Sequence, residues 1–357
     1  MYIYIHIPFC NHICSYCDFP KVLYDKKYIN DYLDNLAKEI NNRYKYELVK
    51  TIYIGGGTPT SLDYDELEKL LKIITIFNKE KTIEYTIESN IESLDDKKIT
   101  LLKQYGINRI SLGVQSFNNE NLIDMGRKHT GIDAINIINK LKKTFTNISI
   151  DLIYGINNNI DIVKKDIDTF LSLDIPHISC YSLIIEDNTI YSINKREYID
   201  DSIEYKMYNY IEYTLKNNSY NHYEVSNYSK EGYESIHNLN YWNNGDYYGF
   251  GLGAVSYINN HRITNTKNLS NYIKGKYLKD DIYENKKIRI SNSLILGLRK
   301  TNGLNIDKFN KKYKVNILNL YNIKDLIKEN KLLINNNRLY INPRYFYLSN
   351  DILINFI

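Results

Sequence analysis

Short runs of apolar and β-branched residues alternate along the chain with longer segments in which apolar residues recur every three or four positions. The short runs predict strands at 2–7, 51–54, 83–87, 109–114, 148–154 and 177–183. Periodic segments predict helices at 29–40 and 67–76, and 95–105 opens with acidic residues and stops at Gly106, as a helix does. Strands alternating with helices predict an α/β fold with a parallel sheet. Six such units predict a partial, open TIM-type (β/α)6 barrel.

The pattern changes after about residue 190. A helix is predicted at 203–216, followed by a Tyr-, Asn- and Gly-rich stretch at 220–257. Residues 288–357 indicate three helices and then two short strands, an order typical of a small winged-helix-like unit. Its predicted core consists of Leu294, Ile295, Leu298, Phe309, Leu318, Leu326, Leu332 and Leu333. We therefore divide the chain into a barrel (1–200), a helical connecting region (201–287) and a C-terminal domain (288–357).

Composition excludes several classes of protein. The chain is 43% hydrophobic and 25% charged, which is ordinary for a soluble globular protein, and no apolar run is long enough to span a membrane. Residues 1–6 do not read as a signal peptide, so we expect a cytoplasmic protein, free or peripheral to the membrane. The net charge of +4 is mild and is spread along the chain, which argues against nucleic acid as a partner.

Three of the four cysteines, Cys10, Cys14 and Cys17, have the spacing C-x3-C-x2-C. Three thiolates on one loop can ligate three irons of a 4Fe–4S cubane and leave the fourth iron open. The amino and carboxylate groups of S-adenosylmethionine (SAM) can chelate that iron. With Tyr16 before the last cysteine, the motif resembles that of the radical SAM superfamily. The alternative is structural zinc, which needs a fourth ligand from His6, His12 or Cys180.

Polar segments follow the predicted strands, and in parallel α/β folds such segments meet at one rim, where ligands bind. Gly55-Gly56-Gly57-Thr58 allows close approach of the backbone to a ligand, although a simple tight turn would look the same. Glu88 can accept ribose hydroxyls or hold a cationic group, or it is a solvated acid. Gln115 offers a donor and an acceptor.

Two further charged residues are expected at this rim. Arg127 can clamp a carboxylate through two parallel hydrogen bonds, although a surface arginine is the alternative. Asp151 lies in a strand that reads as buried, where an unpaired carboxylate would be costly. A paired or functional role is therefore expected for Asp151.

Nearly the whole chain resembles the oxygen-independent coproporphyrinogen III oxidases and their haem-chaperone relatives. The matching stretches are 4–19, 55–60, 87–90, 109–117, 125–130, 151–155, 177–189, 223–228, 237–242 and 249–256. The resemblance implies a partial TIM-type barrel followed by a mainly helical C-terminal domain. It also implies that the following residues lie in or near the SAM site: Tyr4, Gly55, Gly56, Gly57, Thr58, Glu88, Gln115, Arg127, Asp151 and Ile184.

Two features favour the haem-chaperone branch. In the oxidases that the chain resembles, the motif is C-x3-C-x2-C-x-C, whereas Phe19 stands at the position of the fourth cysteine here. The oxidases also carry an extension ahead of the first strand. The resemblance then implies a 4Fe–4S cluster and SAM as cofactors, haem as cargo and haem-accepting proteins such as respiratory enzymes as partners. The cluster and SAM would support homodimerisation or transfer, with an unidentified electron donor. The alternative function is radical decarboxylation of coproporphyrinogen III, which would make the chain an enzyme.

The segment His237-Asn238-Leu239-Asn240-Tyr241-Trp242 is associated with haem in that branch. A neutral imidazole is a good axial ligand of haem iron, so His237 is the candidate haem ligand. The alternative is a buried aromatic anchor with a hydrogen-bonded histidine. Cys180 lies within a predicted strand and is expected to be a small buried hydrophobe without a ligand role.

Overall fold

The computed structural model describes residues 1–357 and is built around one curved, nine-stranded sheet with the strand order β11-β1-β4-β5-β6-β7-β8-β10-β9. The six predicted strands are neighbours within it and run parallel. They are β1 (Tyr2–Ile7), β4 (Val49–Gly56), β5 (Lys79–Asn90), β6 (Arg109–Gln115), β7 (Asn147–Tyr154) and β8 (His177–Ser182). The predicted α/β fold class with a partial barrel is therefore confirmed.

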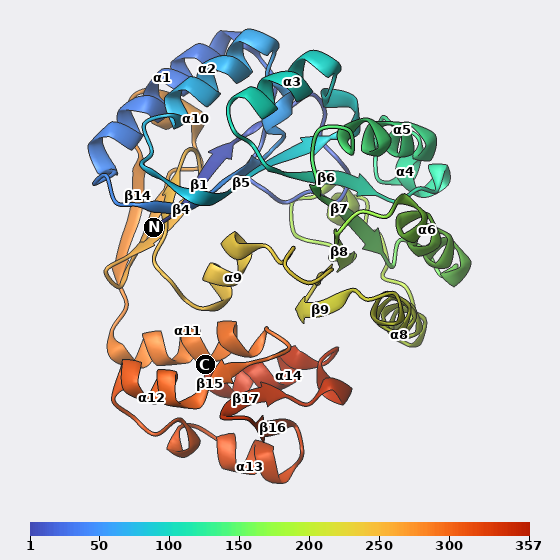
Figure 1. Cartoon of the computed structure of the whole chain (residues 1–357), viewed down its shortest axis with the longest axis vertical. Helices are drawn as coiled ribbons and strands as arrows, with labels where there is room; N and C mark the ends of the chain where they lie inside the picture. The colour runs from blue at the N-terminus through green and yellow to red at the C-terminus, as the bar shows by residue number, and fades with distance from the viewer.

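Helices cover the outer, convex side of this sheet (Figure 1). They are α1 (Lys26–Arg43), α2 (Tyr64–Ile74), α3 (Asp96–Gln104), α4 (Asn119–Asp124), α5 (Gly131–Leu141) and α6 (Ile160–Leu173). Their starts follow local chemistry, because Asp25, Asp63 and Asp95 each accept a hydrogen bond from a backbone N–H of the helix they precede. Packing of their apolar faces on the sheet buries one large core.

Residues 201–287 extend both edges of the same sheet. The predicted helix is α8 (Asp201–Asn217), but six strands that the sequence did not reveal follow it. The strands β9 (Asn221–Glu224) and β10 (Asn227–Ser229) add to β8, while β11 (Tyr248–Phe250) adds to β1. A separate three-stranded sheet contains β12 (Val255–Ile258), β13 (His261–Asn265) and β14 (Leu278–Tyr283). These strands are short and rich in Tyr and Asn, so they lack the regular alternation of apolar and polar residues by which a strand is predicted from sequence.

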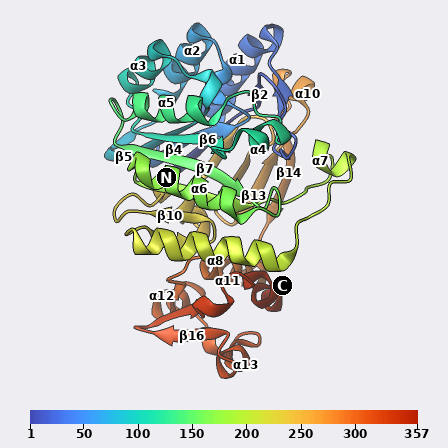
Figure 2. The same cartoon turned by 90° about the vertical axis from the view of Figure 1, so that its right-hand side faces the viewer.

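Short elements complete the barrel. The strands β2 (Phe9–Cys10) and β3 (Val22–Leu23) pair with one another. The helices are α7 (Ile190–Ile193), α9 (Ile236–Trp242) and α10 (Leu269–Ile273). In Figure 1, α9 lies on the inner side of the curved sheet, and Figure 2 shows α7 projecting at the edge of the molecule.

The C-terminal residues form a lower lobe in Figure 1 with a hydrophobic cluster of its own. Its order is α11 (Lys286–Leu298), β15 (Leu304–Asn305), α12 (Ile306–Tyr313), α13 (Ile323–Lys328), β16 (Leu332–Asn335), β17 (Arg338–Ile341) and α14 (Ser349–Leu353). Three helices followed by a β-hairpin match the predicted winged-helix-like order. Of the predicted core residues, Leu333 lies outside this cluster, because side chains of a strand alternate between faces and Leu332 points inward.

The three-part division of the chain stays a prediction, and the extents of the two hydrophobic clusters can be compared with its boundaries. One hydrophobic cluster extends from Ile3 to Tyr272, so it crosses the proposed boundary at residue 200. The second begins at Ile290, close to the proposed boundary at 288. None of the helices has the length and apolar character required to cross a bilayer.

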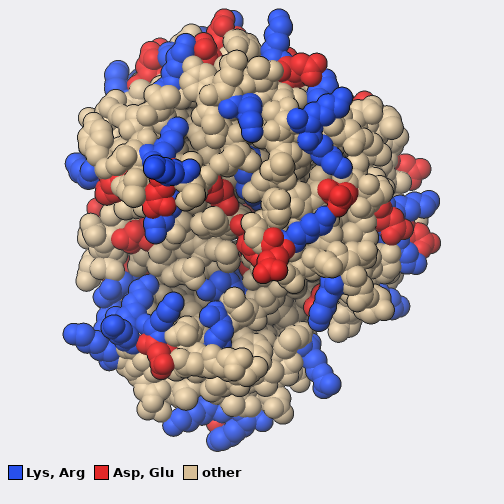
Figure 3. Space-filling view, viewed as in Figure 1, with Lys and Arg blue, Asp and Glu red and all other residues tan.

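Charge is distributed unevenly between these two parts. Residues 286–357 contain 14 Lys and Arg against 4 Asp and Glu, a net charge of +10. Since the whole chain carries +4, residues 1–285 carry −6. The basic side chains are conspicuous over the lower lobe in Figure 3. The expectation of an evenly spread charge is therefore wrong, because the averaged total hides opposite signs in the two parts.

Candidate functional site at the carboxyl end of the barrel

The three clustered cysteines lie on the loop between β1 and α1. Pairing of β2 with β3 closes this loop over the carboxyl ends of the sheet strands. Cys10 and Cys14 are buried and Cys17 is half-buried, and all three line one cavity of about 440 Å³. Ligand sites of small molecules are concave and of this size.

The cavity wall also contains most of the side chains predicted for the SAM site. They are Gly56, Gly57, Thr58, Glu88, Gln115, Arg127, Asp151 and Ile184. Tyr4, Gly55 and His237 are not part of the wall. Tyr4 is hydrogen-bonded through its hydroxyl to Nδ1 of His6, 3.0 Å away, and lies beside Tyr53. Residues from several neighbouring strands and from the loops that follow them thus meet at one cavity.

The glycine-rich turn is shaped by close contacts on both sides. A Cβ atom at Gly57 would lie 2.9 Å from Sγ of Cys10 and 2.7 Å from the carbonyl of Pro8. A Cβ at Gly55 would lie 2.7 Å from the carboxylate of Glu88, and Gly56 has a φ of +118°. Only glycine permits this approach of the turn to the first cysteine and to Glu88. The simple-turn alternative does not explain these contacts.

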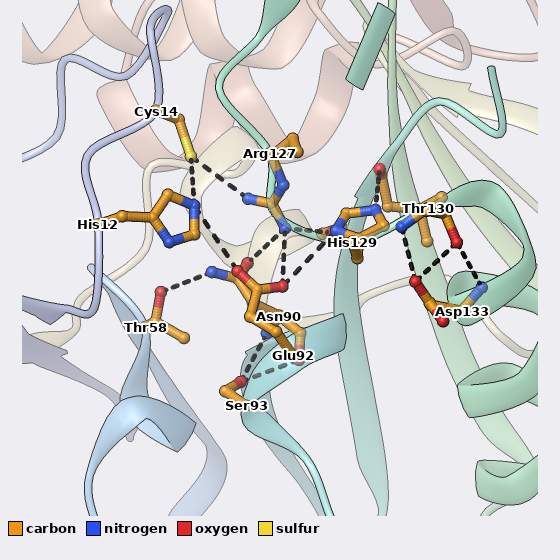
Figure 4. Close-up of polar contacts among 12 residues, drawn as sticks. His12, Cys14, Thr58, Asn90, Glu92, Ser93, Arg127, His129, Thr130 and Asp133 are labelled. Carbon is orange, nitrogen blue, oxygen red and sulfur yellow. Dashed lines mark hydrogen bonds and ion pairs between the residues drawn. The ribbon is translucent and has the colours of Figure 1, made fainter. Parts of the chain in front are cut away.

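Arg127 links the second cysteine to the strand ends (Figure 4). Its Nη1 donates to Sγ of Cys14 at 3.4 Å, and its Nη2 donates to Oδ1 of Asn90 at 3.0 Å and to the carbonyl of Gly113 at 2.8 Å. Burial opposes the charge of this guanidinium, but Tyr16, Cys14 and Glu92 raise its pKa overall. Its Nε is a buried donor without a hydrogen-bond partner. Arg127 is therefore an interior cation of the site, and the surface-arginine alternative is excluded.

Glu92 and Asn90 complete this network, and sequence reasoning missed both. Carboxylate oxygens of Glu92 lie 3.7 Å from Nε2 of His12, 3.6 Å from Nδ1 of His129 and 3.9 Å from Nη2 of Arg127. Burial alone would raise the pKa of Glu92, but His129 and Arg127 lower it to about 2. Asn90 also donates from Nδ2 to Oγ1 of Thr58, which contacts Cys10. Both residues follow Glu88 closely at the end of β5, and this position is the sequence feature that could have identified them.

Two carboxylates face the cavity from neighbouring strands. Glu88 accepts hydrogen bonds from the hydroxyl of Tyr53 at 2.8 Å and from the N–H of Gly56 at 3.0 Å. Burial raises the pKa of Glu88 to about 7 and that of Asp151 to about 6, although Ser179 and Arg109 partly oppose the shift of Asp151. Buried acids with raised pKa values gain from a cationic ligand, which favours their ionised forms.

Gln115 reaches the wall through an irregularity in β6. The pairing of β6 with β7 shifts register between Gly113 and Gln115, and Gln115 has a φ of +70°. A left-handed conformation is costly for a residue with a Cβ, and such residues cluster at ligand sites. The bulge re-aims the amide toward the cavity.

His237 lies in the closed interior at the opposite, amino end of the strands. Its Nδ1 is hydrogen-bonded to Oγ1 of Thr51 at 2.7 Å and its Nε2 to the hydroxyl of Tyr241 at 2.8 Å. The ring is buried and stacks on Tyr53. Burial, and next Arg109, lower the pKa of His237 to about 3. The imidazole is neutral, as a haem ligand requires, but both nitrogens are already engaged.

The candidates for a fourth zinc ligand have other partners. His6 is hydrogen-bonded to Tyr4 and to the carbonyl of Pro20, and Cys180 is buried within β8. His12 lies 3.8 Å from Sγ of Cys14 but also contacts Glu92. The three thiols together with a large cavity, the close Gly57 turn and the unpaired Nε of Arg127 fit a cubane cluster with a bound sulfonium cofactor better than a single zinc ion.

Comparisons with known proteins agree with this geometry. The radical SAM superfamily matches residues 4–170. The chain is 40% identical to the haem chaperone HemW of Lactococcus lactis, covering 99% of this chain and 96% of that protein. It is 35% identical to the haem chaperone HemW of Bacillus subtilis, covering 98% and 97%. Its fold is similar to that of the Escherichia coli coproporphyrinogen III oxidase HemN, with a TM-score of 0.87, 21% identity and coverage of 99% and 89%.

Proposed function

The chain belongs to the HemW family of radical SAM proteins, and from that premise we propose that it is a haem chaperone, which binds haem and passes it to haem proteins. The observation that carries the proposal is the likeness to named haem chaperones, which extends over almost the entire chain and includes the C-terminal lobe. The family implies a 4Fe–4S cluster and SAM as resident cofactors.

The residues of the cavity have distinct parts in holding these cofactors. Cys10, Cys14 and Cys17 provide the thiolates for three irons. Arg127 neutralises charge beside Cys14, and its unpaired Nε is available to a carboxylate. Glu88 and Asp151 favour the cationic and hydroxyl-bearing parts of SAM. The chemistry that the bound pair supplies is one-electron cleavage of a sulfonium C–S bond.

A titration with hemin tests the proposal. The protein is purified and reconstituted without oxygen, and hemin is added while the Soret band is followed. Saturable binding, and subsequent loading of an apo-haem protein such as a respiratory cytochrome, are the expected results. A protein that is replete with iron and sulfide but binds no hemin would refute haem chaperoning.

The intact SAM cavity favours one second candidate, radical decarboxylation of coproporphyrinogen III. The assay supplies SAM, a reductant and coproporphyrinogen to the same reconstituted sample. Formation of protoporphyrinogen and 5′-deoxyadenosine together would establish this activity. The exposed Phe19 in the loop, where a fourth thiol would otherwise stand, leads us to expect neither product.

Haem ligation by His237 belongs to this proposal as well. Coordination through Nε2 would break its hydrogen bond to Tyr241 and require α9 to move away from Tyr53. A low-spin haem spectrum that His237→Ala converts to high spin would support ligation. Haem-dependent homodimerisation and attachment to membranes are measured on the same sample by sedimentation and by flotation with vesicles.

A further inference from the structure

One charged side chain inside the barrel has no partner within the protein. Arg109 is only 2% exposed, and its Nε is a buried donor without a hydrogen-bond partner. No carboxylate forms an ion pair with its guanidinium, because the ion pairs of the structure involve other arginines. A buried charge that is neither paired nor hydrogen-bonded is costly. An unpaired interior cation of this kind therefore indicates a bound anion that neutralises it.

Arg109 lines the same cavity as the residues of the SAM site, but it enters from the opposite end. It is the first residue of β6, whereas Gln115 at the SAM end is the last. A strand of seven residues spans about 20 Å. Ser111 and Gly113, which lie between the two on β6, line the cavity as well. The cavity therefore continues from the cluster loop into the barrel interior.

Helix α9 forms one side of this inner part of the cavity. Asn238, which follows His237 directly, lines the wall and uses its backbone N–H for a hydrogen bond to Ser235, while its side-chain amide has no partner in the protein. Tyr53, which stacks on His237, belongs to the wall too. Burial, and next the charge of Arg109, lower the pKa of His237, so the guanidinium and the imidazole lie within electrostatic range. The unpaired cation thus lies near the segment that carries the candidate haem ligand.

The carboxylates of the cavity do not supply the missing partner when SAM is bound. Burial raises the pKa values of Glu88 and Asp151, and the charge of Arg109 opposes both shifts without forming an ion pair. The cationic parts of SAM compete for the same two carboxylates. The methionine carboxylate of SAM is assigned to the open iron beside the cluster loop. Arg109 is then a cation of the cavity that still lacks an anion.

We propose that Arg109 and Asn238 form a carboxylate subsite in the inner part of the cavity, and that a propionate of the haem held by His237 occupies it. This inference rests on the proposed function, including ligation by His237, and adds the group that recognises the periphery of the porphyrin. A guanidinium can bind a carboxylate through two parallel hydrogen bonds, and the amide of Asn238 can donate a third. Movement of α9 away from Tyr53, which ligation requires, widens the cavity on this side, because α9 and Tyr53 both line it.

The test compares the Kd values for hemin and for hemin dimethyl ester. The full chain carries its cluster, SAM is saturating, no reductant is present, and the pH lies above the pKa values of Glu88 and Asp151. Esterification removes the propionate charges, so the wild-type protein should bind the ester about tenfold more weakly than hemin.

Arg109→Met removes the guanidinium and keeps an unbranched side chain. It should raise the Kd for hemin about tenfold and bind hemin and the ester with Kd values within about threefold of one another. Arg109→Lys keeps the charge, so it should bind hemin more tightly than Arg109→Met does. Arg344→Met on the exposed surface is the matched control and should leave both Kd values unchanged.

Chemical denaturation separates this role from a structural one. Because Arg109 has no partner in the protein, Arg109→Met should not lower the denaturation midpoint of the ligand-free chain. A structural arginine would lower the midpoint and would leave the preference for hemin over its ester intact. That combination of results overturns the proposal.

The remaining outcomes are equally decisive. A wild-type protein that binds hemin and its ester alike overturns the subsite, and this measurement needs no variant. An Arg109→Met protein that binds hemin normally but SAM about tenfold more weakly assigns Arg109 to SAM and overturns it as well. Should Arg109→Met fail to fold, Arg109→Lys and the ester comparison decide. A wild-type protein that binds no hemin refutes the proposed function instead, so the two failures are distinguishable.

Discussion

Both ends of the barrel interior contain buried titratable side chains, but these side chains have different surroundings at the two ends. At the amino end, His237 and His177 each have both ring nitrogens hydrogen-bonded to protein groups. At the carboxyl end, Glu88, Asp151 and Arg127 face a cavity. Burial lowers the pKa of both histidines and raises that of both carboxyl groups.

This difference shows that burial of a polar residue does not by itself mark a ligand site. The two histidines at the amino end have partners for both ring nitrogens within the protein, and these hydrogen bonds stabilise the barrel. At the carboxyl end, polar groups face a cavity of ligand size, so these groups can exchange hydrogen bonds to water for hydrogen bonds to a cofactor. Four predictions probe this contrast, beginning with the largest effect.

Replacement of Cys10, Cys14 and Cys17 by alanine should abolish cluster binding completely. The carboxyl end would lose all three thiolates, while the amino end would be untouched. The broad brownish absorption, together with iron and sulfide content, checks this loss, and far-ultraviolet circular dichroism serves as the folding control. A triple variant that still holds a cluster would place the metal site elsewhere.

His237→Ala should lower the free energy of unfolding by about 3 kcal/mol, because Thr51 and Tyr241 lose their buried partner and a cavity opens beside Tyr53. Chemical denaturation measures this effect. Affinity for hemin should also fall, by about tenfold, because the folded variant lacks the proposed iron ligand. His261→Ala is the control. His261 contacts Asp281 on the exposed surface, so this substitution should lower the free energy of unfolding by less than about 1 kcal/mol. A folded His237 variant that binds hemin like the wild type would mean that His237 has only a structural role.

Arg127→Lys should raise the Kd for SAM about thirtyfold. Lysine keeps the charge but cannot contact Cys14, Asn90 and the carbonyl of Gly113 together. Calorimetry on the cluster-loaded protein measures the affinity, and Arg344→Lys on the exposed surface is the matched control. An affinity equal to that of wild type would mean that Arg127 only supports the loop.

The pH dependence of SAM binding gives the smallest effect. The pKa of Glu88 is raised from 4.5 to about 7, so without ligand its ionised form is disfavoured and its contribution to stability declines as pH rises through that window. A cationic ligand prefers the ionised form, so the Kd for SAM should rise about tenfold between pH 8 and pH 6. Glu88→Gln should bind more weakly but lose most of this dependence. An identical pH profile in the variant would exclude Glu88 as the titrating group.

Much of the site could be predicted from sequence because it depends on local features. The three cysteines, Cys10, Cys14 and Cys17, lie in one loop, and the glycine turn lies in another, so each feature is visible in a short stretch of sequence. The parallel strand pattern then places the loops that follow different strands at one rim. This reasoning correctly brought Glu88, Arg127 and Asp151 to the cavity. It missed Glu92 and Asn90, because contacts among loops depend on side-chain direction after the strand ends.

The sequence by itself determined the α/β class, the six parallel strands and the cluster loop, since periodicity and residue spacing are local properties of the chain. Only the tertiary structure decided that 221–250 adds strands to both edges of the sheet, that His237 is enclosed by Thr51 and Tyr241, and that Arg127 contacts Cys14, Asn90 and the carbonyl of Gly113 together. These features arise from contacts between residues far apart in the chain. Their energies depend on burial and on available partners, which no local pattern records.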